Sequence, residues 1–525
     1  MSDYTILKKD TFFFNNVYMY YIRGGYSCIF VENILNIIIV ALTLIFVLFA
    51  CFFLDWHSIG KCNSEETCKS LSSYIISPTT FHDTSVNVCM FLFISIFLVY
   101  WISINIAMIR DLFVFKHYRT FFKECLNITT NDMKDLKWND IVTKITTFDN
   151  TVTVEHIVGA IMRKDNYLIL IAESDIMGFN KNVYTFGLIW LINIAILNQI
   201  FSGQHNNRKR LIVDRQRMQT VVKILGFLQF FAIPFTLSIL LIHYIVNFTT
   251  DLYTKRSIGP KEWTTYAKLL FREYNELPHI FNERIMKSYK FASLYEKKFY
   301  NTMINIIFDK IIFIFGSYLT LLVILTFYDE RMVMYIRLFD RNLLWFIAIF
   351  TSIISLARMM TTNPYDVDET EEEIMTKISE HTRYFPDEWK TKCHKLEVFN
   401  KFNSLYTYKI TSVFFEIIAV FTIPVYMMTV LPKKMNGIIK LIEVNTIYDD
   451  KLGHICRCGV EVSEKYDIIS EQNSETTIQI DNKSDNKPDT IVTPLIQHEN
   501  NIQIDNQKVD RSIRNFKSYY FSARK

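Results

Sequence analysis

The chain has 525 residues, of which 50% are hydrophobic and 15% aromatic, and only 13 are glycine. This length and apolarity exclude one ordinary soluble domain and favour a protein that enters a membrane. The formal net charge is only +4, which by itself favours neither a nucleic-acid partner nor a strongly basic membrane-surface partner, and we expect no nucleic-acid partner.

Four apolar segments have the character of membrane-spanning helices. They are residues 34–54, 84–109, 311–328 and 343–357. The first is an uncharged run of about 20 residues, enough at 1.5 Å per residue to cross a hydrocarbon core roughly 30 Å thick. No cleavable leader opens the chain, so we expect the first span to act as its own insertion signal. We therefore expect an integral membrane protein with two helix pairs.

Two further apolar stretches, residues 183–201 and 224–246, also carry polar side chains. If both crossed the membrane, the arginine-rich linker between them would lie on the far side and violate the positive-inside bias. If each enters and leaves on one side, the linker stays cytosolic. Polar groups at membrane depth are then tolerated where protein or water covers them. We expect two membrane-dipping segments here.

A third dipping segment is expected at residues 411–431, an apolar run that contains Glu416. Four full spans then place both termini in the cytosol and make residues 55–83 a lumenal loop. The nine cysteines lack paired CxxC spacing, which argues against a zinc ribbon. Cys62 and Cys68 can pair if their loop is lumenal, where disulfides persist.

Cytosolic regions alternate with the helix pairs. The expected order is a short cytosolic segment, a first transmembrane pair, a helical cytosolic region, a second transmembrane pair, another helical cytosolic region and a disordered tail, at residues 1–33, 34–109, 110–310, 311–357, 358–459 and 460–525. The cytosolic regions contain amphipathic patterns such as WNDIVTKITTF, and Thr370 and Glu373 have capping-box spacing. The tail is rich in Asn, Asp, Ser and Gln and cannot bury enough apolar surface to fold.

The usual motifs of catalysis are absent from the sequence. It contains no GxxxxGK[ST], no GxSxG and no HExxH, so phosphate cradling, a nucleophile elbow and a zinc-hydrolase helix lack their residues. The acidic run DVDETEEE lacks the interleaved Asp or Asn and the glycine of a calcium loop. We expect no enzyme activity, no cofactor and no metal.

The stretch SIGPKEWTTYAKLLFREYNELPHIFNERIMKSYKFASLY, residues 257–295, resembles the signature region of the autophagy-related protein 9 family. Further matching motifs follow the family's order over residues 11–460: YYIRGGYSCIF, FLDW, WNDIVTKI, IMRKDNYLI, SLAR, HTRYFPDEWK and LGHICRCG. The resemblance implies an all-α polytopic membrane protein that forms a domain-swapped homotrimer, with four transmembrane helices and membrane-dipping helices in each protomer.

The resemblance also implies phospholipid scrambling in vesicles and growing autophagosomal membranes. It implies partnership with a lipid-transfer protein of the autophagy-related protein 2 family and with its phosphoinositide-binding propeller partner. The expected locations are the phagophore, Golgi-derived cytoplasmic vesicles and endosomes. The N-terminal region is short and the tail modest, which puts scaffold docking through such extensions in doubt. Tyr4 and Leu7 have the form of a clathrin-adaptor motif, although a four-residue match is weak.

A scramblase needs only a hydrated path that lowers the cost of moving a charged headgroup through hydrocarbon. We expect Lys255 and Arg256 at the mouth of such a groove, and Arg272 and Arg358 deeper, to contact phosphate. Anchoring of helix ends by snorkelling is the alternative for the cations. For Glu416, lining the groove and a structural ion pair are both open.

The polar stretch FREYNELPHIFNERI, residues 271–285, cannot face lipid with all its charges. We expect it to be cytosolic, or buried with its charges paired. Pro278 should interrupt any continuous helix. The hypothesis is a structural hub at the trimer interface, formed by Glu276, Pro278 and His279, with Glu276 and Arg272 in one paired network. A trimeric channel and a scaffold that only recruits lipid-transfer proteins are the alternative functions.

Overall fold

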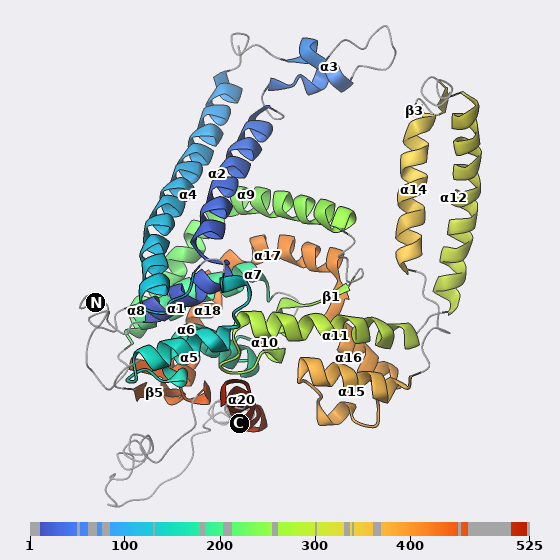
Figure 1. The fold of residues 1–525 in the computed structure, drawn as a ribbon. Helices are drawn as coiled ribbons and strands as arrows, with labels where there is room; N and C mark the ends of the chain where they lie inside the picture. Colours follow the sequence, from blue (N-terminus) through green and yellow to red (C-terminus); the bar gives the residue numbers. More distant parts are fainter. Residues whose placement is uncertain are drawn as a thin grey trace, which may run out of the picture. The chain divides into compact units, whose positions relative to one another are not determined.

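The computed structural model is mostly helical in the residues it describes (Figure 1). These are residues 11–49, 53–60, 71–75, 84–129, 132–178, 184–202, 213–254, 261–299, 302–329, 336–338, 341–360, 369–449, 453–459 and 506–521. Six residues singled out in the sequence lie outside these ranges: Tyr4, Leu7, Cys62, Cys68, Lys255 and Arg256. The chain divides into two compact units, residues 1–161 and 162–525, which are described separately.

The first unit contains a helical hairpin and a layer of shorter helices. Its elements are α1 (Thr11–Ile22), α2 (Tyr26–Leu48), α3 (Trp56–Gly60), η2 (Leu71–Tyr74), α4 (Thr84–Glu124), η4 (Asp132–Lys134), α5 (Trp138–Phe148) and the start of α6 (Val154–Glu173). The axes of α1 and α2 differ by 82°. Gly24 and Gly25 make this bend with φ angles of 73° and 86°, which other residues rarely adopt. Helices α2 and α4 pack along each other and lie where the first transmembrane pair is expected.

The amphipathic pattern of WNDIVTKITTF is confirmed by α5, which buries one face. Trp138, Ile141, Val142 and Ile145 are its buried residues. The Trp138 ring meets that of Tyr18 edge to face at 5.1 Å between centroids. Aromatic packing of this kind anchors α1 and α5 within the first unit.

The second unit contains most of the buried residues, both apolar and polar. Its elements before α12 are α7 (Phe186–Ile192), the π-helical turn η6 (Asn193–Leu197), α8 (Asn198–Ser202), α9 (Arg215–Thr254), β1 (Lys261–Trp263), α10 (Thr265–Phe271) and α11 (Pro278–Lys298). They are followed by α12 (Thr302–Tyr328), β2 (Arg337–Leu338), β3 (Arg341–Asn342), α14 (Leu343–Met360), α15 (Glu371–Thr382), η8 (Asp387–Trp389), α16 (Leu396–Leu405), β4 (Tyr406–Tyr408), α17 (Lys409–Thr429), α18 (Leu431–Val444), β5 (Thr446–Asp449), β6 (Gly453–Cys456), η9 (Arg457–Gly459) and α20 (Asn506–Phe521).

A short antiparallel sheet joins two distant parts of this unit. Strand β1 pairs with β4 in a register that places Trp263 opposite Tyr406. The fully buried Trp263 packs against Phe271 and Phe402, and its Nε1–H donates to the Ser288 hydroxyl at 2.9 Å. This pairing fixes α10 and α11 against α16.

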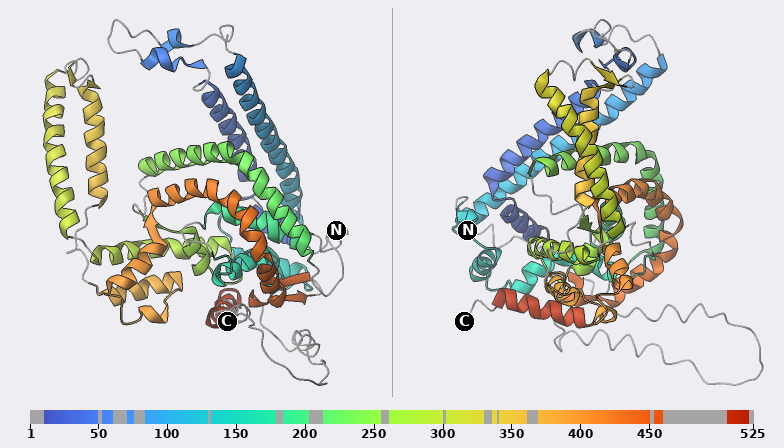
Figure 2. Two further views of the ribbon diagram at one scale, coloured as in Figure 1. Left: turned by 180° about the vertical axis from the view of Figure 1, so that it is seen from behind. Right: turned by 90° about the vertical axis from the view of Figure 1, so that its right-hand side faces the viewer.

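Helices α9 and α17 run along each other in both views (Figure 2). Both are curved, and each contains an internal proline, Pro234 or Pro424, which removes a backbone hydrogen bond and favours bending. Gly226 of α9 lies against α17 so closely that an added Cβ would be 2.9 Å from the Met427 Cβ. A glycine is therefore needed where the two helices touch.

Among the described residues, two helices are long and apolar enough to cross a membrane, namely Asn305–Tyr328 within α12 and Lys409–Thr429, which is α17. The bent pair α1–α2 would make a third candidate if it acts as one span. Helices α12 and α14 pack together at the expected second transmembrane pair. The number of spans and the membrane-dipping role of α7–α8, α9 and α17 stay predictions.

The expectation that residues 460–525 are disordered was wrong for residues 506–521. These residues form α20, a helix that packs against the second unit. The composition of this segment is polar, but its charged side chains meet buried carboxylates of the core. Ion pairing therefore stabilises this helix together with the packing of Val509 and the burial of Tyr520.

Candidate functional site: a buried charge network

The polar stretch 271–285 forms a tight turn between two helices. Helix α10 ends at Phe271, and α11 begins at Pro278, whose missing N–H and fixed φ suit the first position of a helix. Asn275 lies in the turn with a φ of 57°, a left-handed conformation that asparagine tolerates better than most residues. The amide of Glu276 donates to the Glu273 carbonyl at 3.3 Å and closes the turn. The prediction that Pro278 interrupts a continuous helix is confirmed.

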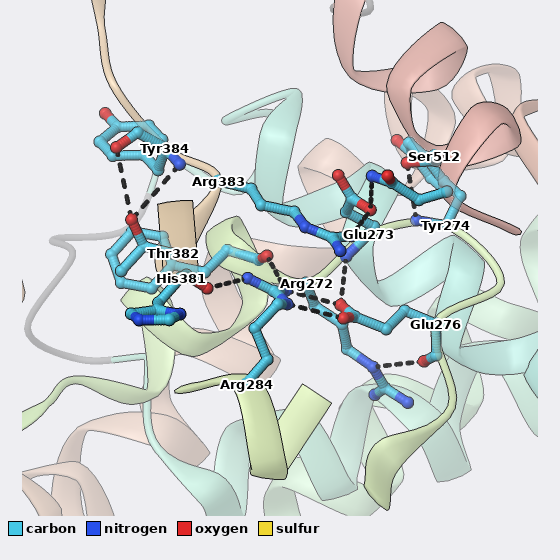
Figure 3. A network of polar contacts seen from close by, with 12 residues as sticks. Arg272, Glu273, Tyr274, Glu276, Arg284, His381, Thr382, Arg383, Tyr384 and Ser512 are labelled. Atoms are coloured by element: carbon cyan, nitrogen blue, oxygen red, sulfur yellow. Dashed lines mark hydrogen bonds and ion pairs between the residues drawn. The ribbon is translucent and has the colours of Figure 1, made fainter. Parts of the chain in front are cut away.

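Glu276 and Arg284 form a buried ion pair with two hydrogen bonds. Nε and Nη2 of Arg284 donate to the two carboxylate oxygens of Glu276 at 2.8 and 2.7 Å. The two side chains are only 9% and 6% exposed. The same guanidinium donates to the carbonyls of Phe271 and His381 (Figure 3). Arg284 thereby connects the turn, the end of α10 and the end of α15.

The carboxylate of Glu273, whose side chain is 2% exposed, accepts from three donors. Arg383, which ends α15 in a left-handed conformation, forms an ion pair with it. From α20, Arg511 donates at 2.8 Å and Asn515 at 2.9 Å. A buried carboxylate is costly unless donors surround it, and these three satisfy both of its oxygens.

Helix α6 contributes two more carboxylates to the network. Asp165 accepts from Arg272 at 2.9 Å, and Glu173 accepts from the Tyr274 hydroxyl at 2.5 Å. Burial, and then the neighbouring Glu173 carboxylate, raise the pKa of Tyr274 well above its usual range. The Tyr274 hydroxyl therefore stays protonated and remains a donor to Glu173.

Asn275 and Asn166 bind each other in a reciprocal pair. The Asn275 amide N–H donates to Asn166 Oδ1 at 3.0 Å, and Asn166 Nδ2 donates back to Asn275 Oδ1 at 2.8 Å. The side-chain Nδ2 of Asn275 donates to the Gly459 carbonyl. A Cβ at Gly459 would lie 2.8 Å from Asn166 Nδ2, so this position has room only for glycine. The turn is thus fixed to both α6 and η9.

The predicted pairing of Glu276 with Arg272 needs correction. Arg272 Nε donates to the backbone carbonyl of Glu276 at 3.3 Å, whereas the Glu276 carboxylate pairs with Arg284. The Arg272 guanidinium is already paired with Asp165, which supports a structural role for Arg272 in place of the expected lipid-phosphate contact. His279 is half-buried in the first turn of α11, and burial lowers its pKa.

The other groove candidates lie on separate elements. Glu416, in α17, accepts from the backbone N–H of Phe186 at 3.0 Å and so contacts the first residue of α7. A carboxylate suits a helix N-terminus because free N–H groups and the helix dipole favour negative charge there. Arg358 lies in the last turn of α14 with an exposed side chain. Lys255 and Arg256 fall outside the described residues, as do Tyr4 and Leu7 of the expected sorting motif.

Sequence reasoning did not single out Glu273, Arg284 or Arg383 as site residues. One signal was present, because charges of both signs crowd the stretch 271–285 and some of them had to pair. The partners were not visible, since Arg383 is 110 positions from Glu273 in the sequence. Only the fold brings these residues together.

The arrangement holds charged groups in place. Each of the network's carboxylates, on Asp165, Glu173, Glu273 and Glu276, already accepts a hydrogen bond or ion pair from the protein. Among the described residues, no group of three His, Cys, Asp or Glu side chains is placed to hold a metal ion. The exposed apolar helices and this buried network of ion pairs together indicate the class of the protein. It is a helical membrane protein with a polar core held by ion pairs.

The sequence model of the family "Autophagy protein ATG9" matches residues 8–460, which is most of the chain. The chain belongs to the ATG9 family of autophagy proteins, as the resemblance predicted. The signature stretch and all of the network except its α20 residues lie inside the matched range.

Individual relatives agree with this assignment. Autophagy-related protein 9 of Saccharomyces cerevisiae (strain S288c) is 28% identical over 478 residues, covering 85% of this chain and 47% of the relative. The Dictyostelium discoideum protein of the same name is 27% identical over 471 residues, covering 85% of this chain and 66% of the relative. The chain thus spans about half the length of the budding-yeast relative.

The fold agrees with a solved structure. The cryo-EM structure of Schizosaccharomyces pombe Atg9 matches with a TM-score of 0.63 at 25% sequence identity, covering 86% of this chain and 98% of that one. The mostly helical, membrane-type architecture expected from the sequence is therefore that of a known family structure.

Proposed function

We propose that the chain is an ATP-independent phospholipid scramblase, which redistributes lipids between leaflets while autophagosome membranes form and expand. Membership of the ATG9 family over residues 8–460 is the observation that carries this proposal. The protein is proposed not to be an enzyme, because exchange of lipids between leaflets breaks no bond. It needs only a lower barrier for the charged headgroup, whose transfer into hydrocarbon is costly.

The curved pair α9 and α17 is the proposed location of the lipid path. Helix α9 ends at Thr254, directly before the two cations Lys255 and Arg256 in the sequence. Helix α17 brings the carboxylate of Glu416 into an otherwise apolar element. Exposed aromatic and aliphatic side chains cover one part of α9, namely Phe227, Leu228, Phe230 and Phe231. Such a surface suits acyl tails, while the cations pair with phosphate oxygens.

The proposed assembly and setting follow from the family. The chain would form a homotrimer with both termini in the cytosol. Its partners would be a lipid-transfer protein of the autophagy-related protein 2 family and the propeller protein that binds phosphoinositides. The proposed locations are the phagophore, Golgi-derived vesicles and endosomes. Clathrin adaptors that bind Tyr4 and Leu7 would explain sorting into those vesicles.

Reconstitution tests the activity and the cationic groove together. The purified protein is placed in liposomes that carry a fluorescent phospholipid in both leaflets, and a membrane-impermeant reductant bleaches the outer leaflet. Without ATP, wild-type protein should increase bleaching well beyond the outer-leaflet half. The variant Lys255→Ala with Arg256→Ala should slow the excess bleaching about tenfold, as expected for loss of two charge-assisted contacts.

A matched control removes two cations elsewhere. Lys290 and Lys395 are exposed residues of the cytosolic helical layer, so Lys290→Ala with Lys395→Ala should bleach like wild type. If both double variants scramble like wild type, the cationic groove is wrong although the activity stands. Ion flux without lipid movement would support a trimeric channel. No flux and no excess bleaching, with the lipid-transfer partner still recruited, would support a scaffold.

A further inference from the structure

Helix α20 presents its polar contacts on a single face. Lys508, Arg511, Ser512 and Asn515 follow the spacing i, i+3, i+4 and i+7, which places them on one side of a helix. Lys508 and Ser512 are buried, with 4% and 2% exposure, although lysine and serine are usually surface residues. This polar face contacts the core alongside apolar side chains of the same helix, because Val509 packs against the hydrophobic core and Tyr520 is buried.

The first half of α20 is held through Lys508. Its ammonium forms an ion pair with Glu173 of α6 and donates to the carbonyl of Leu270 at 2.8 Å. The same ammonium lies 5.7 Å from the centre of the Tyr274 ring. A carboxylate, a carbonyl and an aromatic face together form a receptor for one ammonium group.

The second half is held through Glu273. Arg511 donates to one oxygen of that carboxylate at 2.8 Å, and Asn515 donates to the other at 2.9 Å. Between these contacts, the Ser512 hydroxyl accepts the backbone N–H of Tyr274 at 3.2 Å. The groups that bind these polar side chains come from α6, the end of α10 and the turn that follows it, and η9 also packs against α20.

The receiving surface selects for positive charge. Glu173 and Glu273 are buried beneath the helix with 11% and 2% exposure of their side chains. A helix with neutral residues at positions 508 and 511 would cover Glu173 without supplying a cation and would leave Glu273 with one cation fewer, which is unfavourable. The specificity therefore lies in the two cations and their three-residue separation.

If α20 detaches from the core, both core carboxylates still keep a partner. Glu173 keeps the Tyr274 hydroxyl, and Glu273 keeps Arg383. The segment 460–505 separates α20 from the rest of the second unit, and the family match also ends at residue 460. The receiving surface lies inside the matched range, whereas its occupant lies outside it.

We infer that the Glu173–Glu273–Tyr274 surface is a docking site for a basic helix with the pattern K-x-x-R-S-x-x-N, and that residues 506–521 are its detachable ligand. The site recognises the helix through paired carboxylates and needs no covalent continuity with it. The same peptide supplied as a separate molecule therefore binds whenever the chain's own helix has left.

The test uses full-length protein and a fluorescent peptide of residues 506–521. Hydrogen–deuterium exchange first reports whether the chain's own helix is docked. In Lys508→Ala with Arg511→Ala, amides 506–521 should exchange at least tenfold faster than in wild type. Fluorescence anisotropy should then show saturable peptide binding to this variant and little to wild type, whose site is filled. A peptide with alanine at both cationic positions should not bind.

Arg514→Ala is the matched control, because it removes an arginine from the exposed side of the same helix. It should exchange slowly, as wild type does, and should leave the site filled. Two results would overturn the inference. In the first, amides 506–521 of the double variant stay as protected as in wild type. In the second, they become exposed but the wild-type peptide still fails to bind.

Discussion

At the scale of single residues, the ion pair of Arg284 and Glu276 determines how the signature stretch folds. The guanidinium holds the carboxylate and two backbone carbonyls at once, so its loss would leave one charge and two acceptors without their partner. Removing one member of a buried pair typically costs about 3–5 kcal/mol. We expect Glu276→Ala to lower the thermal unfolding temperature of the detergent-solubilised protein by several degrees.

Glu283 provides the control for that measurement. It pairs with Lys287 one helical turn away, but both side chains are mostly exposed. Pairs of this kind contribute only about 0.3–0.5 kcal/mol, so Glu283→Ala should unfold at nearly the wild-type temperature. Equal shifts in the two variants would show that the buried pair is not the important one.

His279 makes the stability of this region depend on pH. Burial lowers its pKa in the folded protein below the ordinary value of 6.5, and the nearby Glu283 only partly opposes this. The unfolded chain therefore takes up the proton first as the pH falls. Stability is complete above about pH 6.5 and declines below it, until the folded state is protonated too.

Replacement of His279 by glutamine should weaken this dependence. Unfolding temperatures measured at pH 7.5 and pH 5.5 should differ less in His279→Gln than in wild type. His381, whose pKa burial also lowers, remains and should preserve part of the effect. A pH dependence identical to that of wild type would refute the role of His279.

The sequence shows that the charged side chains of residues 271–285 must pair, but it does not show which residues are their partners. Six arginine, glutamate and histidine side chains crowd residues 271–285, so a buried network was predictable. Arg272 nevertheless pairs with Asp165, 107 positions away, and not with the nearby Glu276 carboxylate. Which of several available charges meet depends on how α6, α10 and α15 pack, and single-sequence patterns do not encode that.

At the scale of elements, the contact between α9 and α17 depends on Gly226. An added Cβ would come within 2.9 Å of the Met427 Cβ and 3.1 Å of the Pro424 carbonyl oxygen. Neither atom is the end of a flexible side chain, so the helices would have to separate. We expect Gly226→Ala to destabilise the protein by about 1–3 kcal/mol, measured by thermal unfolding in detergent.

Gly316 of α12 is the matched glycine, because an added Cβ there meets nothing within 4 Å. Alanine favours a helix over glycine by about 0.5–1 kcal/mol, so Gly316→Ala should be neutral or slightly stabilising. Destabilisation of the same size in both variants would mean that the effect at Gly226 does not come from the close contact between α9 and α17.

Elements differ in how well the sequence predicts them. The amphipathic spacing of α5 and the capping box at Thr370 and Glu373 were readable, because local chemistry decides both. Helix α20 was missed because its composition resembles that of unfolded segments. Its partners in the core include Glu173 and Glu273, which lie more than 200 positions earlier in the chain.

At the scale of the whole molecule, apolar composition and family membership lead to the same class of protein. Exposed side chains such as Phe313 at 73% and Phe327 at 88% on α12 would be unfavourable in water and suit a lipid environment. The proposed homotrimer belongs to this scale as well. It predicts a particle of three chains in light scattering of the detergent-solubilised protein.

The most direct test of the account is the scrambling rate of two glycine variants. Gly226→Leu disturbs the α9–α17 contact beside the proposed lipid path, whereas Gly316→Leu adds the same side chain to an open face of α12. Both are reconstituted in liposomes at equal protein content, and the outer-leaflet fluorescent lipid is bleached without ATP. The account predicts that Gly226→Leu loses most of the excess bleaching and that Gly316→Leu retains it. Equal rates in the two variants would contradict a lipid path along α9 and α17.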